Sequence, residues 1–171
     1  SLRMKGVPTL SSYSGNDQSD AALIIAANKI GYPIMIKAAA HSEGKGLWEV
    51  DSAENLPATL ISARQIAKQA LGDDTLLLEH LVPNARHIEV QIFGDKLGNV
   101  IALGERECNI QRRYQPVIEE SPSTLLPSRL RSTLFEIAVG IGTHLDYYSA
   151  GTVKFLVDES LHFYFIGMNT C

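Results

Sequence analysis

The spacing of apolar and polar residues predicts short strands and helices in the first half of the chain. A turn at residues 15–20 ends in a helix N-cap signal, and the residues after it are apolar and helix-favouring. The predicted elements are a helix at 21–30, a buried strand at 34–38, a returning strand at 47–50, a helix at 52–70 and a strand at 75–81. Together they predict a small α+β unit over residues 17–81, preceded by a connecting segment at 1–16.

The second predicted helix has a regular apolar face. We expect it to begin with a cap at Ser52 and to end near Ala70. Its small and apolar residues recur at helical spacing, which predicts that they face the core. They are Ala53, Leu56, Leu60, Ala63 and Ala67.

The second half of the chain, residues 82–171, is dominated by strands. Residues 87–93 alternate between polar and apolar, which predicts a strand with one buried face. The apolar positions are Ile88, Val90 and Ile92, and the polar ones are His87, Glu89 and Gln91. A hairpin turn, a partner strand at 100–111, a helix from Pro127 to His144 and a hairpin of strands at 150–157 and 162–168 follow.

Charged residues are concentrated on the first of these strands and the segments after it. Residues 86–89 and 105–120 hold four cations and five carboxylates. Such a density is not typical of residues that pack a core. Because it falls on strands rather than on a solvated helix, we interpret it as a site for an anionic substrate.

Composition narrows the class of protein. The chain of 171 residues has 45% hydrophobic and 20% charged residues, as soluble globular domains do. A net charge of −4 argues against a nucleic-acid-binding protein. No apolar run is long enough to span a membrane, and the N-terminal residues lack a signal-peptide core. The two cysteines do not make a disulfide framework, and Cys108 is expected to be a buried thiol. We expect a cytoplasmic or organelle-matrix protein, and the abrupt ends suggest a piece of a larger one.

Five ordered motifs resemble the biotin carboxylase subunits of biotin-dependent carboxylases. They are residues 31–38 (GYPIMIKA), 86–91 (RHIEVQ), 105–113 (ERECNIQRR), 149–153 (SAGTV) and 163–170 (FYFIGMNT). The closest resemblance is to the α chains of acyl-CoA carboxylases, and residues 13–20 (YSGNDQSD) resemble the methylcrotonyl-CoA carboxylase branch. The motifs span essentially the whole chain.

The resemblance implies an ATP-grasp fold of the α+β class, in which two halves close on Mg-ATP. Residues 17–81 would be the lid subdomain, and residues 82–171 the first part of the C-terminal subdomain. In that family ATP phosphorylates bicarbonate, and the carboxy group passes to biotin on a carrier domain. A separate carboxyltransferase then transfers the carboxy group to an acyl-CoA. The resemblance is to the α chains of methylcrotonyl-CoA and propionyl-CoA carboxylases. The mitochondrial matrix or the cytoplasm would be its compartment.

The resemblance also assigns nucleotide-binding residues. A lysine in an apolar strand should face an anion, and Lys37 would bind ATP phosphates. Glu79, His80 and Leu81 match the hinge that holds ribose and adenine. His87 and Gln111 would line the nucleotide site, with Glu89 close to it and Arg112 as a further cation.

The glycine-rich lid loop of the family corresponds here to residues 40–46. Converging backbone N–H groups of such a loop bind phosphate oxygens. Gly44 and Gly46 remain, and Lys45 matches the basic position. Glu43 brings a negative charge to the same loop, so we expect an impaired phosphate grip.

Several reaction positions of the family are replaced. Asn169 matches a metal ligand, but the two metal-binding glutamates fall at Lys154 and Gly167. A hard cation such as Mg²⁺ needs oxygen ligands, so metal binding should be weak or lost. Tyr114 and Pro116 replace a histidine and a lysine, and Cys171 replaces an arginine needed for carboxylation.

Three interpretations remain open. The chain is an ATP-binding fragment of a biotin carboxylase that is inactive alone, or a catalytically dead ATP-grasp-like domain that serves as a binding or assembly module. A third is a non-catalytic oligomerisation fragment.

Overall fold

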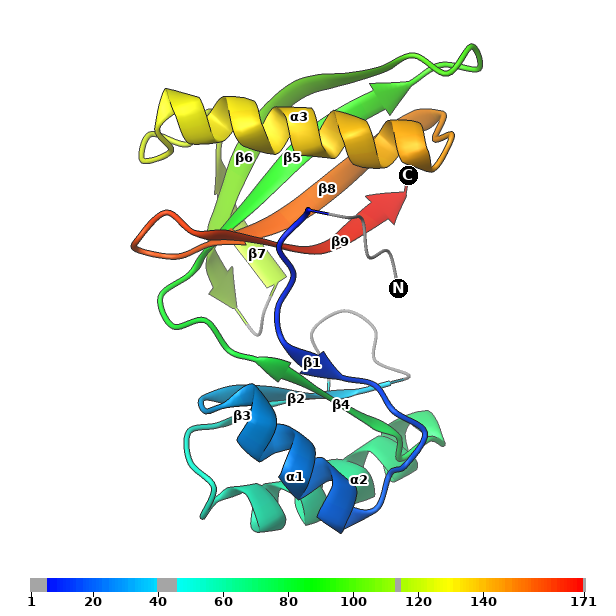
Figure 1. The fold of residues 1–171 in the computed structure, drawn as a ribbon, viewed down its shortest axis with the longest axis vertical. Helices are drawn as coiled ribbons and strands as arrows, with labels where there is room; N and C mark the ends of the chain where they lie inside the picture. The colour runs from blue at the N-terminus through cyan, green and yellow to red at the C-terminus, as the bar shows by residue number, and fades with distance from the viewer. Residues whose placement is uncertain (1–5, 40–45, 113–114, 171) are drawn as a thin grey trace. The chain divides into compact units, whose positions relative to one another are not determined.

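The elements of the chain form two compact units, each with its own antiparallel sheet (Figure 1). The computed structural model describes residues 6–39, 46–112 and 115–170. The smaller unit comprises mainly residues 10–83, and the larger one comprises residues 84–112 and 116–170 with residues 6–9. In the described residues no helix is long and apolar enough to cross a membrane.

The smaller unit is a four-stranded sheet with two helices packed on one face. Its strands lie in the order β1-β4-β2-β3. In chain order the elements are β1 (Ser12–Tyr13), α1 (Asp20–Ile30), β2 (Ile34–Ala38), β3 (Leu47–Val50), α2 (Leu56–Leu71) and β4 (Leu76–His80). Every helix and strand predicted for this half is present, although α2 begins later than predicted, and β1 falls in the segment that we had expected only to connect.

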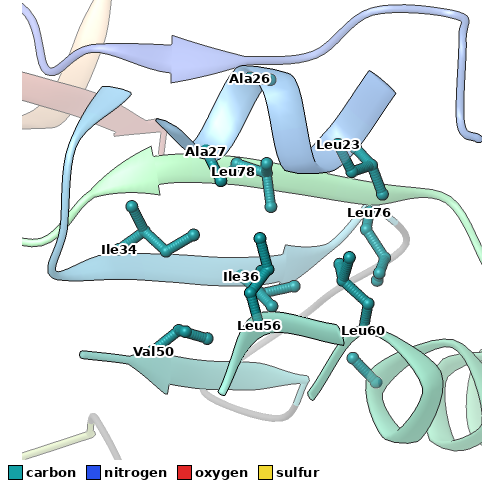
Figure 2. Packing of buried hydrophobic residues seen from close by; sticks show 11 residues of the cluster. Leu23, Ala26, Ala27, Ile34, Ile36, Val50, Leu56, Leu60, Leu76 and Leu78 are labelled. Atoms are coloured by element: carbon teal, nitrogen blue, oxygen red, sulfur yellow. The ribbon is translucent and has the colours of Figure 1, made fainter. Parts of the chain in front are cut away.

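One hydrophobic cluster holds both helices against this sheet (Figure 2). The strands contribute alternate residues, Ile34 and Ile36 from β2 and Leu76 and Leu78 from β4, because the strand period of two puts these on one face. The helices contribute residues at helical spacing, namely Leu23, Ala26, Ala27, Leu56, Leu60 and Ala63. The opposite face of the sheet is left for polar residues such as Lys37 and Glu79.

Helix α2 begins later than predicted. Residues 52–55 form a turn in which the Asn55 amide donates to the Ser52 carbonyl at 3.2 Å, and Ala53 is exposed. Pro57 lies in the first helical turn, where backbone N–H groups have no partner within the helix, so the absence of an N–H at Pro57 costs no helical hydrogen bond. The predicted Ser52 cap was therefore wrong, while the buried face from Leu56 onward is confirmed.

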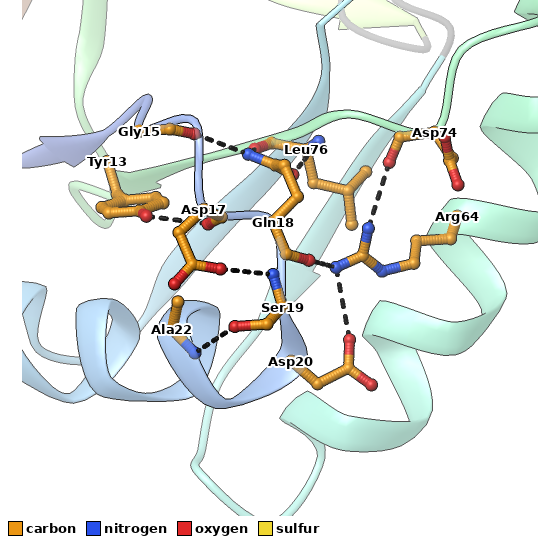
Figure 3. A network of polar contacts seen from close by, with 10 residues as sticks. All are labelled: Tyr13, Gly15, Asp17, Gln18, Ser19, Asp20, Ala22, Arg64, Asp74 and Leu76. Carbon is orange, nitrogen blue, oxygen red and sulfur yellow. Dashed lines mark hydrogen bonds and ion pairs between the residues drawn. The ribbon is translucent and has the colours of Figure 1, made fainter.

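A polar network fixes the segment that leads into α1 (Figure 3). The Ser19 hydroxyl accepts from the Ala22 amide at 3.3 Å, which confirms the predicted N-cap. The Gln18 side chain bonds both the carbonyl and the amide of Leu76, at 3.2 and 2.9 Å. Arg64 of α2 donates to the Gln18 carbonyl and pairs with Asp20 at 3.2 Å. The residues 13–20 that carry part of the family resemblance thus have a structural role.

The larger unit is a five-stranded sheet, in the order β7-β6-β5-β8-β9, with one helix across a face (Figure 1). Its elements are β5 (Arg86–Gly94), β6 (Val100–Arg112), β7 (Gln115–Glu120), α3 (Ser128–His144), β8 (Ser149–Val157) and β9 (Phe163–Thr170). These confirm the predicted strands and helix, whereas β7 was missed because residues 115–120 read as a charged segment around Pro116.

Helix α3 covers the face of this sheet that carries its apolar residues. Ile88, Val90 and Ile92 of β5 pack with Val153 and Phe155 of β8 and with the buried side of α3. The alternation predicted for residues 87–93 is confirmed, and it leaves the polar side chains on the face opposite α3.

Two glutamates of the charged segment are buried on the helix-covered face, contrary to expectation. Glu105 and Glu107 pair with Val90 and Ile88 across β5 and β6, so they share the apolar face. Glu105 accepts from Arg131 of α3 at 2.7 Å, and Glu107 accepts from the Ser123 hydroxyl. These hydrogen bonds offset the cost of burying the two carboxylates. Part of the charge that we had assigned to a substrate site therefore holds α3 and its preceding loop in place.

Candidate functional site

A row of four residues crosses the larger sheet on the face opposite α3. Arg106 of β6 lies directly opposite Glu89 of β5, Glu89 lies opposite Lys154 of β8, and Lys154 lies opposite Gly167 of β9. Directly opposite residues point their side chains to the same face. The sheet thus lines up a cation, a carboxylate, a second cation and a position without a side chain.

Glu89 is the centre of this row and is almost fully buried, with a side chain only 4% exposed. Arg106 donates to its Oε2 through Nη2 at 2.6 Å and through Nε at 2.9 Å. Lys154 Nζ lies 3.4 Å from its Oε1. One carboxylate is therefore shared by two cations, which is the arrangement that keeps a buried acid ionised.

The ionisation of Glu89 and Arg106 follows from these contacts. Burial by itself raises the pKa of the Glu89 carboxyl, but the Arg106 hydrogen bonds and the Lys154 charge more than offset burial and hold the pKa below its ordinary 4.5. The same hydrogen bonds raise the pKa of Arg106. Both groups are charged at neutral pH.

His87 is held beside this row in its neutral form. Its two ring nitrogens are buried and have no hydrogen-bond partner among the described residues, and Nε2 lies 3.8 Å from Glu89 Oε1. Burial lowers the pKa of the imidazole, and although Glu89 opposes this effect, Lys154 and Arg106 add to it. The expected position of His87 and Glu89 on one polar face is confirmed by this contact.

Cys108 completes a cluster that sequence reasoning missed. Ligand atoms of His87, Glu89 and Cys108 all lie within 4.8 Å of one another. No local spacing signals this cluster, since strand pairing brings Cys108 to the other two. Burial raises the pKa of the Cys108 thiol to about 11, with the charges of Glu89 and Glu119 adding to the effect. A protonated thiol beside a carboxylate held by two cations does not suit a metal ion.

The magnesium that the family resemblance implies does not fit the residues on this face. Mg²⁺ requires oxygen ligands in nearly octahedral geometry. Asn169 is exposed and lies opposite Thr152, two residues along β9 from Gly167. The positions where the family has its two glutamates carry the Lys154 ammonium and Gly167. A cation bound here would meet a fixed positive charge and would lack two of its carboxylates.

The smaller unit has its own charged pair on the face opposite its helices. Lys37 of β2 donates to Glu79 of β4, and their side chains are 34% and 23% exposed. The structure thus brings together two residues that the sequence assigned to phosphate and ribose. The anion that Lys37 faces is the Glu79 carboxylate, and both groups remain accessible to solvent.

The strand end after Glu79 is tied to neighbouring segments. The amides of His80 and Leu81 donate to the carbonyls of Ser11 and Pro33, at 2.8 and 3.0 Å. A ring nitrogen of His80 lies 3.3 Å from the Gly31 carbonyl. The Gly46 carbonyl accepts from the Ala38 amide at 3.0 Å, and the φ of +85° at Gly46 is one that favours glycine.

Several predicted positions fall outside what the structure describes. Gly44, Lys45, Tyr114 and Cys171 lie outside the described residues. Gln111, Arg112 and Pro116 lie within strands, but their side chains are not among those described.

Comparison with known proteins gives the class of this fold and site. The family model for the carbamoyl-phosphate synthase L chain, ATP binding domain, matches residues 1–171, and the chain belongs to this family. The methylcrotonoyl-CoA carboxylase α subunit of rat mitochondria is 46% identical to the chain over 165 residues, which are 96% of this chain and 23% of that protein.

Solved structures agree with this assignment. A biotin carboxylase–beta-gamma-ATP complex from Campylobacter jejuni superposes with a TM-score of 0.89 at 45% identity, over 96% of this chain and 37% of that one. The biotin carboxylase domain of the Hydrogenobacter thermophilus 2-oxoglutarate carboxylase was solved with MgADP and bicarbonate. It superposes with a TM-score of 0.89 at 42% identity, over 96% of this chain and 36% of that one. The predicted ATP-grasp fold and the resemblance to biotin carboxylases are confirmed, and the chain spans about a quarter of the rat relative's length.

Proposed function

We propose that this chain is the ATP-binding part of a biotin carboxylase and that it binds a nucleotide but does not carboxylate biotin by itself. The family assignment over residues 1–171 is the observation that carries the proposal. The accessible Lys37–Glu79 pair supports it further, because it offers a cation for phosphate and a carboxylate for ribose hydroxyls in one place.

In this proposal residues 17–81 act as the lid subdomain and residues 82–171 as part of the C-terminal subdomain. Nucleotide contacts would come from Lys37, the loop ending at Gly46, residues 79–81, His87 and Gln111. The full protein would use ATP, bicarbonate and biotin, and would work with a biotin carrier domain and a carboxyltransferase subunit. Its compartment would be the cytoplasm or the mitochondrial matrix.

The substituted positions are the reason to expect no carboxylation of biotin by this chain. Lys154 and Gly167 leave Asn169 without carboxylate neighbours, so Mg²⁺ binding is weak or lost. Pro116 supplies no charge for bicarbonate, and Cys171 supplies no guanidinium. The test is ADP release from ATP with bicarbonate and free biotin. We expect background rates, and turnover of even ~1 s⁻¹, a modest value for an enzyme, would overturn the proposal.

The second candidate function is a binding or assembly module derived from the same fold. The Lys154–Glu89 ion pair favours it, because a lysine paired within the protein stands at a reaction position of the family. The two functions differ in how ATP binds. Saturable ATP binding in the micromolar range, in EDTA or with Mg²⁺, would exclude the module, whereas ATP binding too weak to saturate would favour it.

A further inference from the structure

Lys154 keeps hydrogen-bonding capacity that the protein itself does not use. Among the described residues its only ion pair is with Glu89, at 3.4 Å, and its side chain is 24% exposed. Arg106, in contrast, is engaged by Glu89 and also by Glu119 at 3.0 Å. Since an ammonium carries three N–H donors, Lys154 has donors left for a ligand.

The two cations on this face are not compensated equally. Arg106 and Lys154 carry +2 and Glu89 and Glu119 carry −2, so the four groups are neutral together. Glu119 pairs with Arg106 and not with Lys154, and Glu89 lies closer to Arg106 than to Lys154. Lys154 is therefore the less compensated of the two cations, and its end of the row attracts anions.

The position opposite Lys154 on β9 is open. Gly167 lies directly opposite Lys154, and a Cβ built at Gly167 would meet no atom within 4 Å. Asn169, two residues further along β9, is exposed and adds an amide donor on the same side. A ligand oxygen on the β9 side of Lys154 would thus find a cation, a neutral donor and, at Gly167, no carboxylate side chain.

We propose that Lys154 is a fixed cation that binds phosphate oxygens of a metal-free polyphosphate on this face of the sheet. The ammonium takes the place of a divalent cation in neutralising the phosphates, so magnesium competes with the protein for the ligand. The inference deepens the proposed function, since the choice of phosphate as the anion rests on it.

The experiment is a calorimetric titration of the full chain with inorganic pyrophosphate in EDTA, repeated with excess Mg²⁺. We expect binding in EDTA that weakens when Mg²⁺ is added. Lys154→Gln should weaken it at least about fivefold, the effect of one unit-charge contact at ~4 Å in a fully aqueous environment. Lys154→Arg should retain most of it. The matched control is Lys96→Gln, which removes an exposed lysine from the turn between β5 and β6.

A second variant guards against loss of folding at position 154. Gly167→Glu places a carboxylate in the open space opposite Lys154 without contacting other atoms at its Cβ. It should neutralise the ammonium and abolish pyrophosphate binding while the far-ultraviolet circular dichroism stays that of the wild type. Pyrophosphate binding that is unchanged in a folded Gly167→Glu variant overturns the proposal.

A parallel titration with ATP separates this inference from the proposed function. If ATP binds more tightly with Mg²⁺ than in EDTA, nucleotide binding stands, but the role of Lys154 and the proposed loss of Mg²⁺ binding are both wrong. If pyrophosphate binds through Lys154 but ATP binds no better than pyrophosphate, the anion site stands and the nucleotide proposal fails. If neither ligand binds, both are wrong.

Discussion

Arg106 places two guanidinium nitrogens on one carboxylate oxygen of Glu89, at 2.6 and 2.9 Å, although Glu89 is almost completely buried. The Glu89 carboxylate is paired with Arg106 of strand β6 and with Lys154 of strand β8. Glu89 therefore links three adjacent strands of the larger sheet on the face opposite α3.

Glu89→Gln should destabilise the larger unit by about 1–3 kcal/mol, the cost of leaving partly buried charged partners without their acceptor. Arg106 and Lys154 would then repel each other without a carboxylate between them. Chemical denaturation followed by circular dichroism measures the effect. The matched control is Glu119→Gln, which removes the exposed partner of Arg106 and should change stability by less than about 1 kcal/mol. Equal effects of the two variants would contradict this role of Glu89.

His87 should make the protein less stable as the pH falls below about 6.5, the ordinary pKa of histidine. Its folded-state pKa is lowered, so the unfolded chain binds the proton first, and the free energy of unfolding decreases toward acidic pH. One proton contributes at most about 1.4 kcal/mol per pH unit. Denaturation between pH 7.5 and 5.5, above the range of the glutamates, measures the slope.

His87→Gln should flatten this part of the pH dependence. The surface variant His162→Gln, whose side chain is 71% exposed, should leave the contribution of His87 in place. A slope that His87→Gln leaves unaltered would show that the imidazole is not kept neutral by its surroundings.

Neighbouring residues of α2 should differ sharply in their effect on the smaller unit. Leu60 is 1% exposed in the core and Ile61 is 64% exposed. Leu60→Ala should cost about 2–5 kcal/mol through lost burial and a cavity, whereas Ile61→Ala should change stability by no more than about 0.5 kcal/mol. Trp48, the single tryptophan, packs against this core and reports its unfolding by fluorescence. Similar costs for the two variants would mean that α2 does not pack on the sheet by this face.

Restoring two carboxylates should create affinity for a divalent cation. Lys154→Glu combined with Gly167→Glu would give oxygen ligands beside Asn169, and the space at Gly167 admits the new side chain. We expect saturable Mg²⁺ binding to the double variant, because two carboxylates and an amide oxygen are ligands that this cation prefers. Titration calorimetry with Mg²⁺ alone measures it. Gly167→Glu alone, which keeps Lys154, should not bind, and wild-type binding as tight as that of the double variant would refute the account.

The elements of the fold follow from local signals in the sequence. Alternation identified β5 and its buried face, and the glycine and proline positions separated the strands of the smaller unit. The start of α2 was misplaced because a serine resembles a cap in sequence, while the first helical turn is set by Pro57. Strand β7 was missed because its charged residues suggest a solvated segment, although pairing with β6 makes it a strand.

The candidate site was predictable only in part. Strand alternation put His87 and Glu89 on a common face, and the family resemblance pointed to Lys37, Glu79 and Lys154. The contacts of Glu89 with Arg106 and Lys154 depend on the register of three strands, which no local pattern encodes. The burial of Glu105 depends likewise on Arg131 of α3, which is 26 residues further along the chain.

Calorimetric titration of the full chain with ATP in EDTA, followed by the same titration with Mg²⁺, tests the central claim most directly. The account predicts saturable binding in EDTA that Mg²⁺ does not strengthen, because nucleotide contacts remain while the acidic metal ligands are replaced. Absence of saturable binding under both conditions would contradict the claim that this chain is a nucleotide-binding domain.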